Sequence, residues 1–181
     1  MIPIRFPAAF ASLTLFMAAP AHAELPVGAK APAFTAQAAL GGKPFSFSLT
    51  EALRKGPVVL YFYPKAFTQG CTLEAHAFAE ATPDFQKAGA TVIGMSADDL
   101  PTLQKFSTEE CRDKFAVASA TPAIVRSYDV DLVRDGKSTG YTKRTSYVIA
   151  RDGKITLVHS DMDYREHVSL ALAAVRKLHH H

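Results

Sequence analysis

One apolar run restricts the folds open to this chain more than any other feature of its sequence. Residues 58–63 read VVLYFY, continuously apolar and β-prone, and Pro64 follows them directly. A strand without polar alternation has to be covered on both faces, as happens in the centre of a sheet that carries helices on each side. The run therefore predicts a central, fully buried strand in a layered α/β domain.

The segments around this run alternate between strand and helix patterns. Further strands are expected at 45–49, 91–95, 115–118, 145–150 and 154–159. Helices are expected after a cap at Thr50, at 72–87, from a cap at Asp98-Asp99 to about 110, at 124–128 and at 165–178. Residues 24–42 read as an extended arm that ends in a Gly41-Gly42 turn, and residues 151–153 (RDG) as a hairpin turn. This order predicts an α/β sandwich with a mixed central sheet, without internal repeats or linkers.

Composition indicates one ordinary globular domain and narrows the function classes. The 181 residues are 48% hydrophobic and 20% charged, with two cysteines and a formal net charge of +3. These values exclude intrinsic disorder and a disulfide scaffold. The basic excess is small and not gathered in a run, and no glycine-rich phosphate loop occurs, so neither nucleic acid nor nucleotide is expected as a partner. The histidines lack ligand spacing, so we expect no metal and no other cofactor.

Residues 1–23 have the pattern of a secretory signal peptide. Arg5 precedes an apolar stretch at 8–19, and small residues at Ala21 and Ala23 mark a cleavage site before Glu24. The stretch is about twelve residues long, whereas a membrane span needs roughly 20, and no later segment is long and apolar enough. We expect residues 24–181 to form a soluble exported domain without a membrane partner, periplasmic if the source is Gram-negative. Disulfides persist in such compartments, so a disulfide between the two cysteines is possible there.

Cys71 lies at a position in the sequence that favours a reactive thiolate. It falls at the start of the helix that follows the buried strand and its loop, and the free N–H groups and positive dipole end of a helix favour a thiolate. Thr68, three residues earlier, has a hydroxyl that can donate to this thiolate or to a bound oxygen substrate. The alternative is an inert buried cysteine beside a capping threonine. Pro64, Thr68 and Cys71 occur together on one strand–loop–helix turn. This combination favours a reactive thiol over an inert cysteine.

The same residues carry a resemblance to a known family. Pro64, Thr68 and Cys71 match the P-x-x-x-T-x-x-C signature of peroxiredoxins, and the segment YFYPKAFTQGCTLEA is similar to the bacterioferritin-comigratory, or Q-type, subgroup. The similarity extends over most of the chain, from residues 27–34 to the hairpin at 145–159. It implies a thiol peroxidase on a thioredoxin-like fold, with a central mixed β-sheet flanked by helices.

The resemblance also implies a role for each site residue. Cys71 would be the peroxidatic cysteine, whose thiolate attacks hydrogen peroxide or an organic hydroperoxide and becomes a sulfenic acid. Thr68 would orient the thiolate and the peroxide, and Pro64 would shield the sulfenate from water. Arg144 matches a family arginine on a later strand, whose fixed charge would favour the thiolate, and Glu74 matches a carboxylate that holds it. From the residues alone, Arg144 would be a solvated charge next to the hairpin.

Cys111 has three open interpretations. Many Q-type members carry a resolving cysteine five residues after the peroxidatic one, but His76 occupies that position here, and we expect it to be a solvated helix histidine. Cys111, at the end of the helix that reaches about 110, lies in a run that is not strongly apolar and is expected to be within reach of solvent. We predict that it resolves the sulfenic acid through an intramolecular disulfide, which a thioredoxin-like or other dithiol reductant then reduces. The alternatives are a bystander in a one-cysteine enzyme and a permanent bridge to Cys71.

Other function classes explain the sequence less well. A thiol-disulfide oxidoreductase of the same fold generally uses Cys-x-x-Cys, which this chain lacks. For a non-catalytic binding module, the match at Cys71, its two loop partners and Arg144 would be a coincidence. The leading interpretation is thus a peroxidase with a hydroperoxide as substrate, and the resemblance favours a monomer. The segment Asp161-Met162-Asp163 is expected to be a solvated turn before the last helix.

Overall fold

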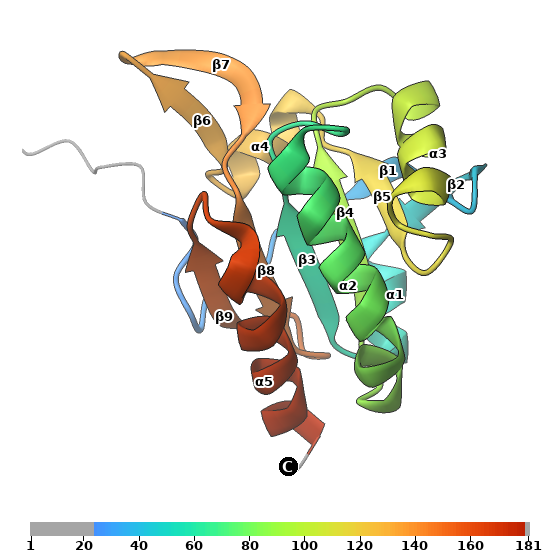
Figure 1. Cartoon of the computed structure of the whole chain (residues 1–181). Helices are drawn as coiled ribbons and strands as arrows, with labels where there is room; N and C mark the ends of the chain where they lie inside the picture. Colours follow the sequence, from blue (N-terminus) through green and yellow to red (C-terminus); the bar gives the residue numbers. More distant parts are fainter. Residues whose placement is uncertain (1–23, 180–181) are drawn as a thin grey trace, which may run out of the picture.

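A mixed sheet organises the part of the chain that the computed structural model describes, residues 24–179 (Figure 1). Its seven strands lie in the order β2-β1-β5-β4-β3-β8-β9. They are β1 (Thr35–Leu40), β2 (Lys43–Ser48), β3 (Val58–Phe62), β4 (Thr91–Ser96), β5 (Ala116–Ser119), β8 (Thr145–Ile149) and β9 (Ile155–Ser160). β3 pairs with β4, and β4 with β5, in parallel, whereas the outer pairs are antiparallel. The predicted α/β class with a central mixed sheet is confirmed.

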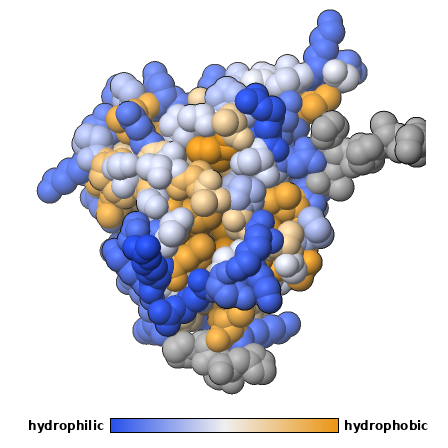
Figure 2. Space-filling model, turned by 180° about the vertical axis from the view of Figure 1, so that it is seen from behind, coloured by the Kyte–Doolittle hydropathy of each residue, from blue (hydrophilic) through white to orange (hydrophobic). Residues whose placement is uncertain are grey.

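Helices cover both faces of this sheet (Figure 1). One face carries α2 (Gln69–Lys87), α3 (Leu100–Glu109) and α5 (His167–His179), the last entered through a short 3-10 turn, Tyr164–Glu166. The other face carries α1 (Leu49–Lys55), α4 (Pro122–Ser127) and the N-terminal arm. Seen from this second side, apolar surface gathers in the middle of the molecule and polar side chains surround it (Figure 2).

The buried strand predicted from the apolar run is β3, and all its side chains are buried. Side chains alternate across a strand, so Val59 and Tyr61 face the core under α2, while Val58, Leu60 and Phe62 face the opposite core. The ring of Tyr61 stacks on Phe78 of α2 with the ring centroids 4.2 Å apart. This packing fixes α2, and with it Cys71, over the end of β3.

Three local expectations need correction. The 24–42 arm contains β1, which turns through Gly41-Gly42 and pairs with β2 along its whole length. Ser48 caps α1 instead of Thr50, because the Ser48 hydroxyl accepts a hydrogen bond from the Glu51 amide. Helix α2 begins at Gln69 and not at residue 72, whereas the predicted cap at Asp99 is confirmed by its bond from the Thr102 amide.

One hairpin was not predicted at all. It consists of β6 (Asp131–Arg134) and β7 (Lys137–Thr142), which pair with each other outside the main sheet. Its turn is Asp135-Gly136, with both residues at positive φ, 52° and 72°. An Asp-Gly pair is a strong hairpin signal, so this element was available from the sequence.

The sequence also led to predictions about a signal peptide and about membrane-spanning segments. Residues 1–23, predicted to be a signal peptide, lie outside the described residues, as do His180 and His181. Over the described range, none of the helices has both the length and the hydrophobicity that a membrane crossing requires.

Candidate active site

Cys71 lies in the first turn of α2, at the carboxyl end of β3. The first helical hydrogen bond runs from the Thr72 amide to the Thr68 carbonyl, 2.9 Å. The amide groups of residues 69–71 therefore stay outside the helical ladder and point toward the loop. The Cys71 side chain is only 2% exposed. The sulfur thus has the helix terminus that the sequence predicted, in a site that excludes most water.

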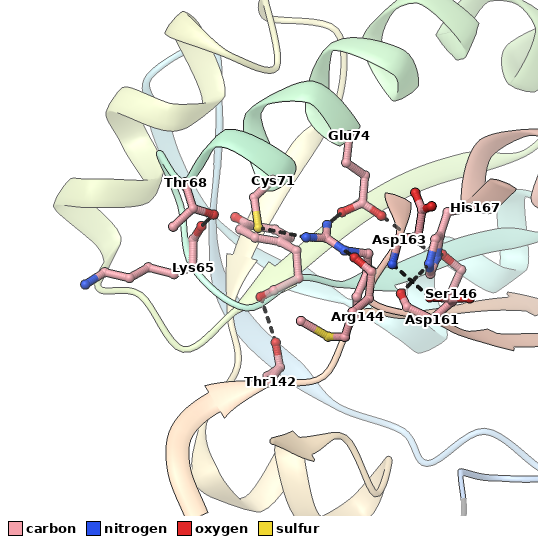
Figure 3. A network of polar contacts seen from close by, with 12 residues as sticks. Lys65, Thr68, Cys71, Glu74, Thr142, Arg144, Ser146, Asp161, Asp163 and His167 are labelled. Atoms are coloured by element: carbon pink, nitrogen blue, oxygen red, sulfur yellow. Dashed lines mark hydrogen bonds and ion pairs between the residues drawn. The ribbon is translucent and has the colours of Figure 1, made fainter. Parts of the chain in front are cut away.

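The loop between β3 and α2 is held at several points. The Ala66 amide donates to the Asp98 carboxylate at 2.7 Å. The Thr142 hydroxyl donates to the Tyr63 carbonyl at 2.7 Å (Figure 3). Phe67 has a φ of 63°, an unusual conformation for a residue with a side chain. Pro64 is half-buried in this loop. The loop is therefore a defined structure, with a strained residue directly before Thr68.

Thr68 occupies the N-cap position, but its side chain makes no capping hydrogen bond. Its hydroxyl donates to the Lys65 carbonyl at 2.9 Å (Figure 3). A hydroxyl has one proton, so donation to the Cys71 sulfur or to an oxygen substrate requires rotation of this side chain. Thr68 is therefore not the capping side chain of the alternative interpretation, although the burial that this interpretation expects of Cys71 is observed.

Arg144 is the residue whose surroundings differ most from those of a solvated charge. It is only 4% exposed. Its Nη2 donates to the Cys71 sulfur at 3.5 Å, its Nε donates to the Met162 carbonyl at 3.0 Å, and its Nη1 contacts the Glu74 carboxylate (Figure 3). The guanidinium fork is thus fixed in three directions with one arm on the sulfur.

Burial and charge act against each other in this pair. Burial raises the pKa of Glu74 to about 8, although the charge and hydrogen bond of Arg144 lower it. Burial lowers the pKa of Arg144, but the interactions of its guanidinium with Glu74 and Cys71 outweigh burial and raise this pKa. The guanidinium therefore remains a cation next to the sulfur.

His167 supports this arrangement, although no motif around it in the sequence indicates such a role. It is fully buried. Its Nε2 lies 2.9 Å from the Asp161 carbonyl, which can only accept, so Nε2 carries the proton and Nδ1 accepts from the Ser146 hydroxyl at 2.8 Å (Figure 3). Burial lowers the pKa of His167 to about 4. A neutral imidazole thus fixes the turn whose Met162 carbonyl orients Arg144.

The Glu74 carboxylate uses its two oxygens differently. Oε2 contacts Arg144, whereas Oε1 has no hydrogen-bond partner among the described residues and lies 3.8 Å from Nδ1 of His167. The 161–163 turn, expected to be merely solvated, contributes its main chain to the site. The structure therefore brings Cys71, Glu74 and Arg144 together, with Thr68 and Pro64 in the adjoining loop.

Cys111 forms no disulfide with Cys71, and the expectation that its thiol is within reach of solvent is wrong. It follows the last residue of α3 and its cap, Glu110, and it is fully buried in the apolar core under α2. Burial raises the pKa of its thiol, and the charges of Glu110 and Asp113 raise it further. Both cysteines are free thiols in this structure.

His76 is not the solvated histidine that was expected. Its Nε2 lies 2.7 Å from a carboxylate oxygen of Glu110, and its side chain is 29% exposed.

Within residues 24–179, no three His, Cys, Asp or Glu side chains gather as a metal ion would require. Arg144 also lines a cavity of about 770 Å³, together with residues of β6 and the segment 160–162.

Comparisons with known proteins agree on one family. Residues 27–158 match the model of the AhpC/TSA family. The chain is 32% identical to chloroplastic peroxiredoxin Q of Suaeda salsa, over 86% of this chain and 70% of that protein. It is 31% identical to peroxiredoxin Bcp of Escherichia coli, over 64% of this chain and 75% of that protein. The crystal structure of peroxidoxin BcpB from Mycobacterium tuberculosis superimposes with a TM-score of 0.72 at 32% identity, covering 84% of this chain and 97% of that one.

Proposed function

Since the chain belongs to the AhpC/TSA family, as a peroxiredoxin of the Bcp and Q kind, we propose that it reduces hydroperoxides through a sulfenic acid formed at Cys71. Membership in this family makes it a peroxidase and an oxidoreductase. One observation carries the assignment to Cys71: a buried, permanently charged guanidinium donates to its sulfur at 3.5 Å. A cation in a site of low dielectric favours the thiolate, which is the nucleophilic form.

The first step transfers two electrons from sulfur to peroxide. The Cys71 thiolate attacks the terminal oxygen, the O–O bond breaks, and the leaving oxygen takes up a proton to give water or an alcohol. Negative charge moves from sulfur onto the leaving oxygen, and the Nη2 of Arg144 is placed to stabilise this charge. Glu74 holds the guanidinium in position. Thr68, after rotation from Lys65, donates to the peroxide, and Pro64 limits water access to the product.

The second step returns Cys71 to a form that a reductant can use. The Cys111 thiol attacks the sulfenic sulfur, so a disulfide forms and water leaves. A thioredoxin-like or other dithiol then reduces the bridge and is itself oxidised to a disulfide. The presence of both cysteines in one apolar cluster supports this pairing. The full burial of Cys111 favours the competing one-cysteine cycle, in which an external thiol attacks the sulfenic acid directly.

We also propose that the protein acts outside the cytosol. The pattern of residues 1–23 supports export, with removal of this segment before Glu24. In a Gram-negative source the protein would act in the periplasm, so its reductant would be an exported dithiol protein. Since the resemblance to the Q-type subgroup favours a monomer, we expect a single chain to be the active unit.

Intact-mass analysis after one equivalent of hydrogen peroxide tests both steps. Reduced wild type is expected to lose two hydrogens as the disulfide forms, Cys111→Ser to gain oxygen on Cys71, and Cys71→Ser to stay reduced. Peroxide consumption by Cys71→Ser at the wild-type rate would overturn the assignment of the nucleophile. Oxygen gain in both wild type and Cys111→Ser, without a disulfide, would overturn the resolving role and support the one-cysteine cycle.

A further inference from the structure

A hydrogen bond and an ion pair join α2 to the segment that carries Cys111. The Nε2 of His76 donates to a carboxylate oxygen of Glu110 at 2.7 Å, and Nη1 of Arg112 donates to the Glu80 carboxylate at 3.4 Å. His76 and Glu80 are one helical turn apart and share one face of α2. Glu110 and Arg112 are the two chain neighbours of Cys111. The two pairs therefore hold the chain on both sides of the cysteine.

The thiol itself lies on the inner side of this connection. Cys111 is fully buried in the cluster that contains Tyr61, Phe106 and Phe115, while its two neighbours are at the surface. Its amide donates to the Phe106 carbonyl and its carbonyl accepts from the Lys114 amide, both at 3.0 Å. Cys71 belongs to the same cluster, but the two thiols are not bonded. Because the two sulfurs are not within bonding distance, the packing around Cys111 has to change before a disulfide with Cys71 can form.

The backbone around Cys111 is suited to such a movement. Residues 110–115 form neither helix nor strand between α3 and β5. Arg112 and Asp113 have φ values of 52° and 57°, a left-handed conformation that costs free energy in residues with a Cβ. Opening of this segment relieves that strain and breaks only the bonds that join it to the end of α3, from the Cys111 amide to Phe106 and from the Asp113 amide to Ser107. Its connections to α2 therefore oppose a movement that the local backbone favours.

We propose that the His76–Glu110 and Glu80–Arg112 pairs form a latch that controls how fast Cys111 reaches the sulfenic acid at Cys71. This inference rests on the proposed resolving role of Cys111. Burial keeps the Cys111 thiol protonated, since it raises the pKa of this group. Opening of the latch therefore both moves the thiol and makes it more reactive.

The latch has a second consequence, because the sulfenic acid has two fates. Attack by Cys111 gives the disulfide and releases water. Attack by the sulfenic acid on a second hydroperoxide gives a sulfinic acid at Cys71 and releases an alcohol or water. Thiols do not reduce the sulfinic acid. A closed latch prolongs the life of the sulfenic acid and so favours the sulfinic product at high peroxide. His76 and Glu110 are thereby positioning residues for the resolving step.

The two pairs are expected to contribute unequally. The side chains of His76 and Glu110 are 29% and 20% exposed, whereas those of Arg112 and Glu80 are 47% and 72% exposed. Solvent screens the second pair more strongly. We expect His76→Ala or Glu110→Ala to speed disulfide formation about two- to fivefold, and Glu80→Ala by less than about twofold.

Single-turnover kinetics with hydrogen peroxide test the latch. Asp84→Ala is the matched control, because Asp84 lies on α2 but pairs with Arg176 and Lys87, away from Cys111. The oxidation of Cys71 is expected at the wild-type rate in every variant. Disulfide formation is expected to be faster in the latch variants only, and the peroxide concentration that gives half sulfinic acid is expected to rise by the same factor. Equal rates of disulfide formation in all variants would overturn the latch.

A second measurement does not depend on peroxide chemistry. In a Cys71→Ser background, N-ethylmaleimide labels Cys111 only when the segment opens. We expect His76→Ala to raise the labelling rate about two- to fivefold, with no change from Asp84→Ala. Unchanged labelling would overturn the latch itself. Faster labelling together with a wild type that forms no Cys71–Cys111 disulfide would instead overturn the resolving role on which the proposal rests.

Discussion

The Nη2 atom of Arg144 lies 3.5 Å from the sulfur of Cys71, and both side chains are almost completely withdrawn from solvent. Water screens little of the attraction between a guanidinium and a thiolate in such a site. The same atom can follow the negative charge as it moves from sulfur to the departing oxygen. This one contact therefore serves the ground state and the transition state of the proposed reaction.

Replacement of Arg144 is expected to slow sulfenic acid formation without unfolding the protein. Arg144→Gln removes the charge, and we expect the second-order rate constant with hydrogen peroxide to fall about 10²-fold. Arg144→Lys keeps the charge but loses the fork that reaches Cys71, Glu74 and the Met162 carbonyl together, so a fall of about tenfold is expected. Stopped-flow measurement of Cys71 oxidation checks both. A rate constant for Arg144→Gln within twofold of wild type would be incompatible with this role.

The hydroxyl of Thr68 is expected to matter more than its methyl group. Its bond to the Lys65 carbonyl competes with donation to the peroxide, so the group acts only after rotation. Thr68→Ser keeps a hydroxyl and should stay within about threefold of the wild-type rate constant, whereas Thr68→Val should lose about 10²-fold. The same stopped-flow assay separates them. If both variants lost activity equally, packing and not hydrogen bonding would explain the effect.

Gly70 leaves room for the guanidinium beside Cys71. A Cβ at this position would lie 3.2 Å from Nη2 of Arg144, so an alanine would push the group away by a few tenths of an ångström. Alanine favours a helix over glycine, so Gly70→Ala is expected to change the free energy of unfolding by no more than about 1 kcal/mol. The oxidation rate constant should nevertheless fall about tenfold. Gln69→Ala, on the same turn of α2, is the control and should leave the rate unchanged.

The burial of neutral His167 predicts a loss of stability in acid. Its pKa is lowered to about 4 in the folded protein, so between about pH 6.5 and pH 4 the unfolded chain binds a proton that the folded chain does not. Stability from this group is thus present above about pH 6.5 and lost as the pH falls, by up to about 3 kcal/mol. His159 and Arg144 add to the effect, because their charges also oppose protonation of His167.

Urea unfolding of wild type and His167→Gln over this pH range tests whether His167 lowers the free energy of unfolding as the pH falls. The difference in free energy of unfolding between the two proteins should shrink as the pH falls, because the glutamine does not titrate. Groups distant from residue 167 titrate in both proteins and largely cancel in the difference. A constant difference across the range would contradict the buried neutral imidazole.

The sequence predicted the parts of this fold and site that depend on local patterns. The apolar run at 58–63 indicated β3, and the Arg151-Asp152-Gly153 turn indicated the β8–β9 hairpin, because in both cases the signal lies in consecutive residues. Cys71 was placed near a helix start for the same reason. The β6–β7 hairpin at 131–142 has a local signal of the same kind, the Asp135-Gly136 pair, although no hairpin was predicted there.

The remainder of the site depends on contacts between distant segments. Arg144 is separated from Glu74 by 70 residues along the chain, and no local pattern distinguishes it from a solvated charge, so only the family resemblance pointed to it. His167 and the Met162 carbonyl were missed because their roles arise when α5 packs against β8. The polar surroundings of Cys111 suggested exposure, but its neighbours take the surface and the thiol turns inward.

The most direct test of the account uses the Cys111→Ser protein, in which Cys71 is the remaining thiol. Reduced protein is mixed rapidly with equimolar hydrogen peroxide, and free thiol is counted over time. The account predicts that the Cys71 thiol disappears within seconds and that Arg144→Gln in the same background slows this about 10²-fold. A thiol that persists for many minutes, or that reacts equally fast with and without Arg144, would contradict it.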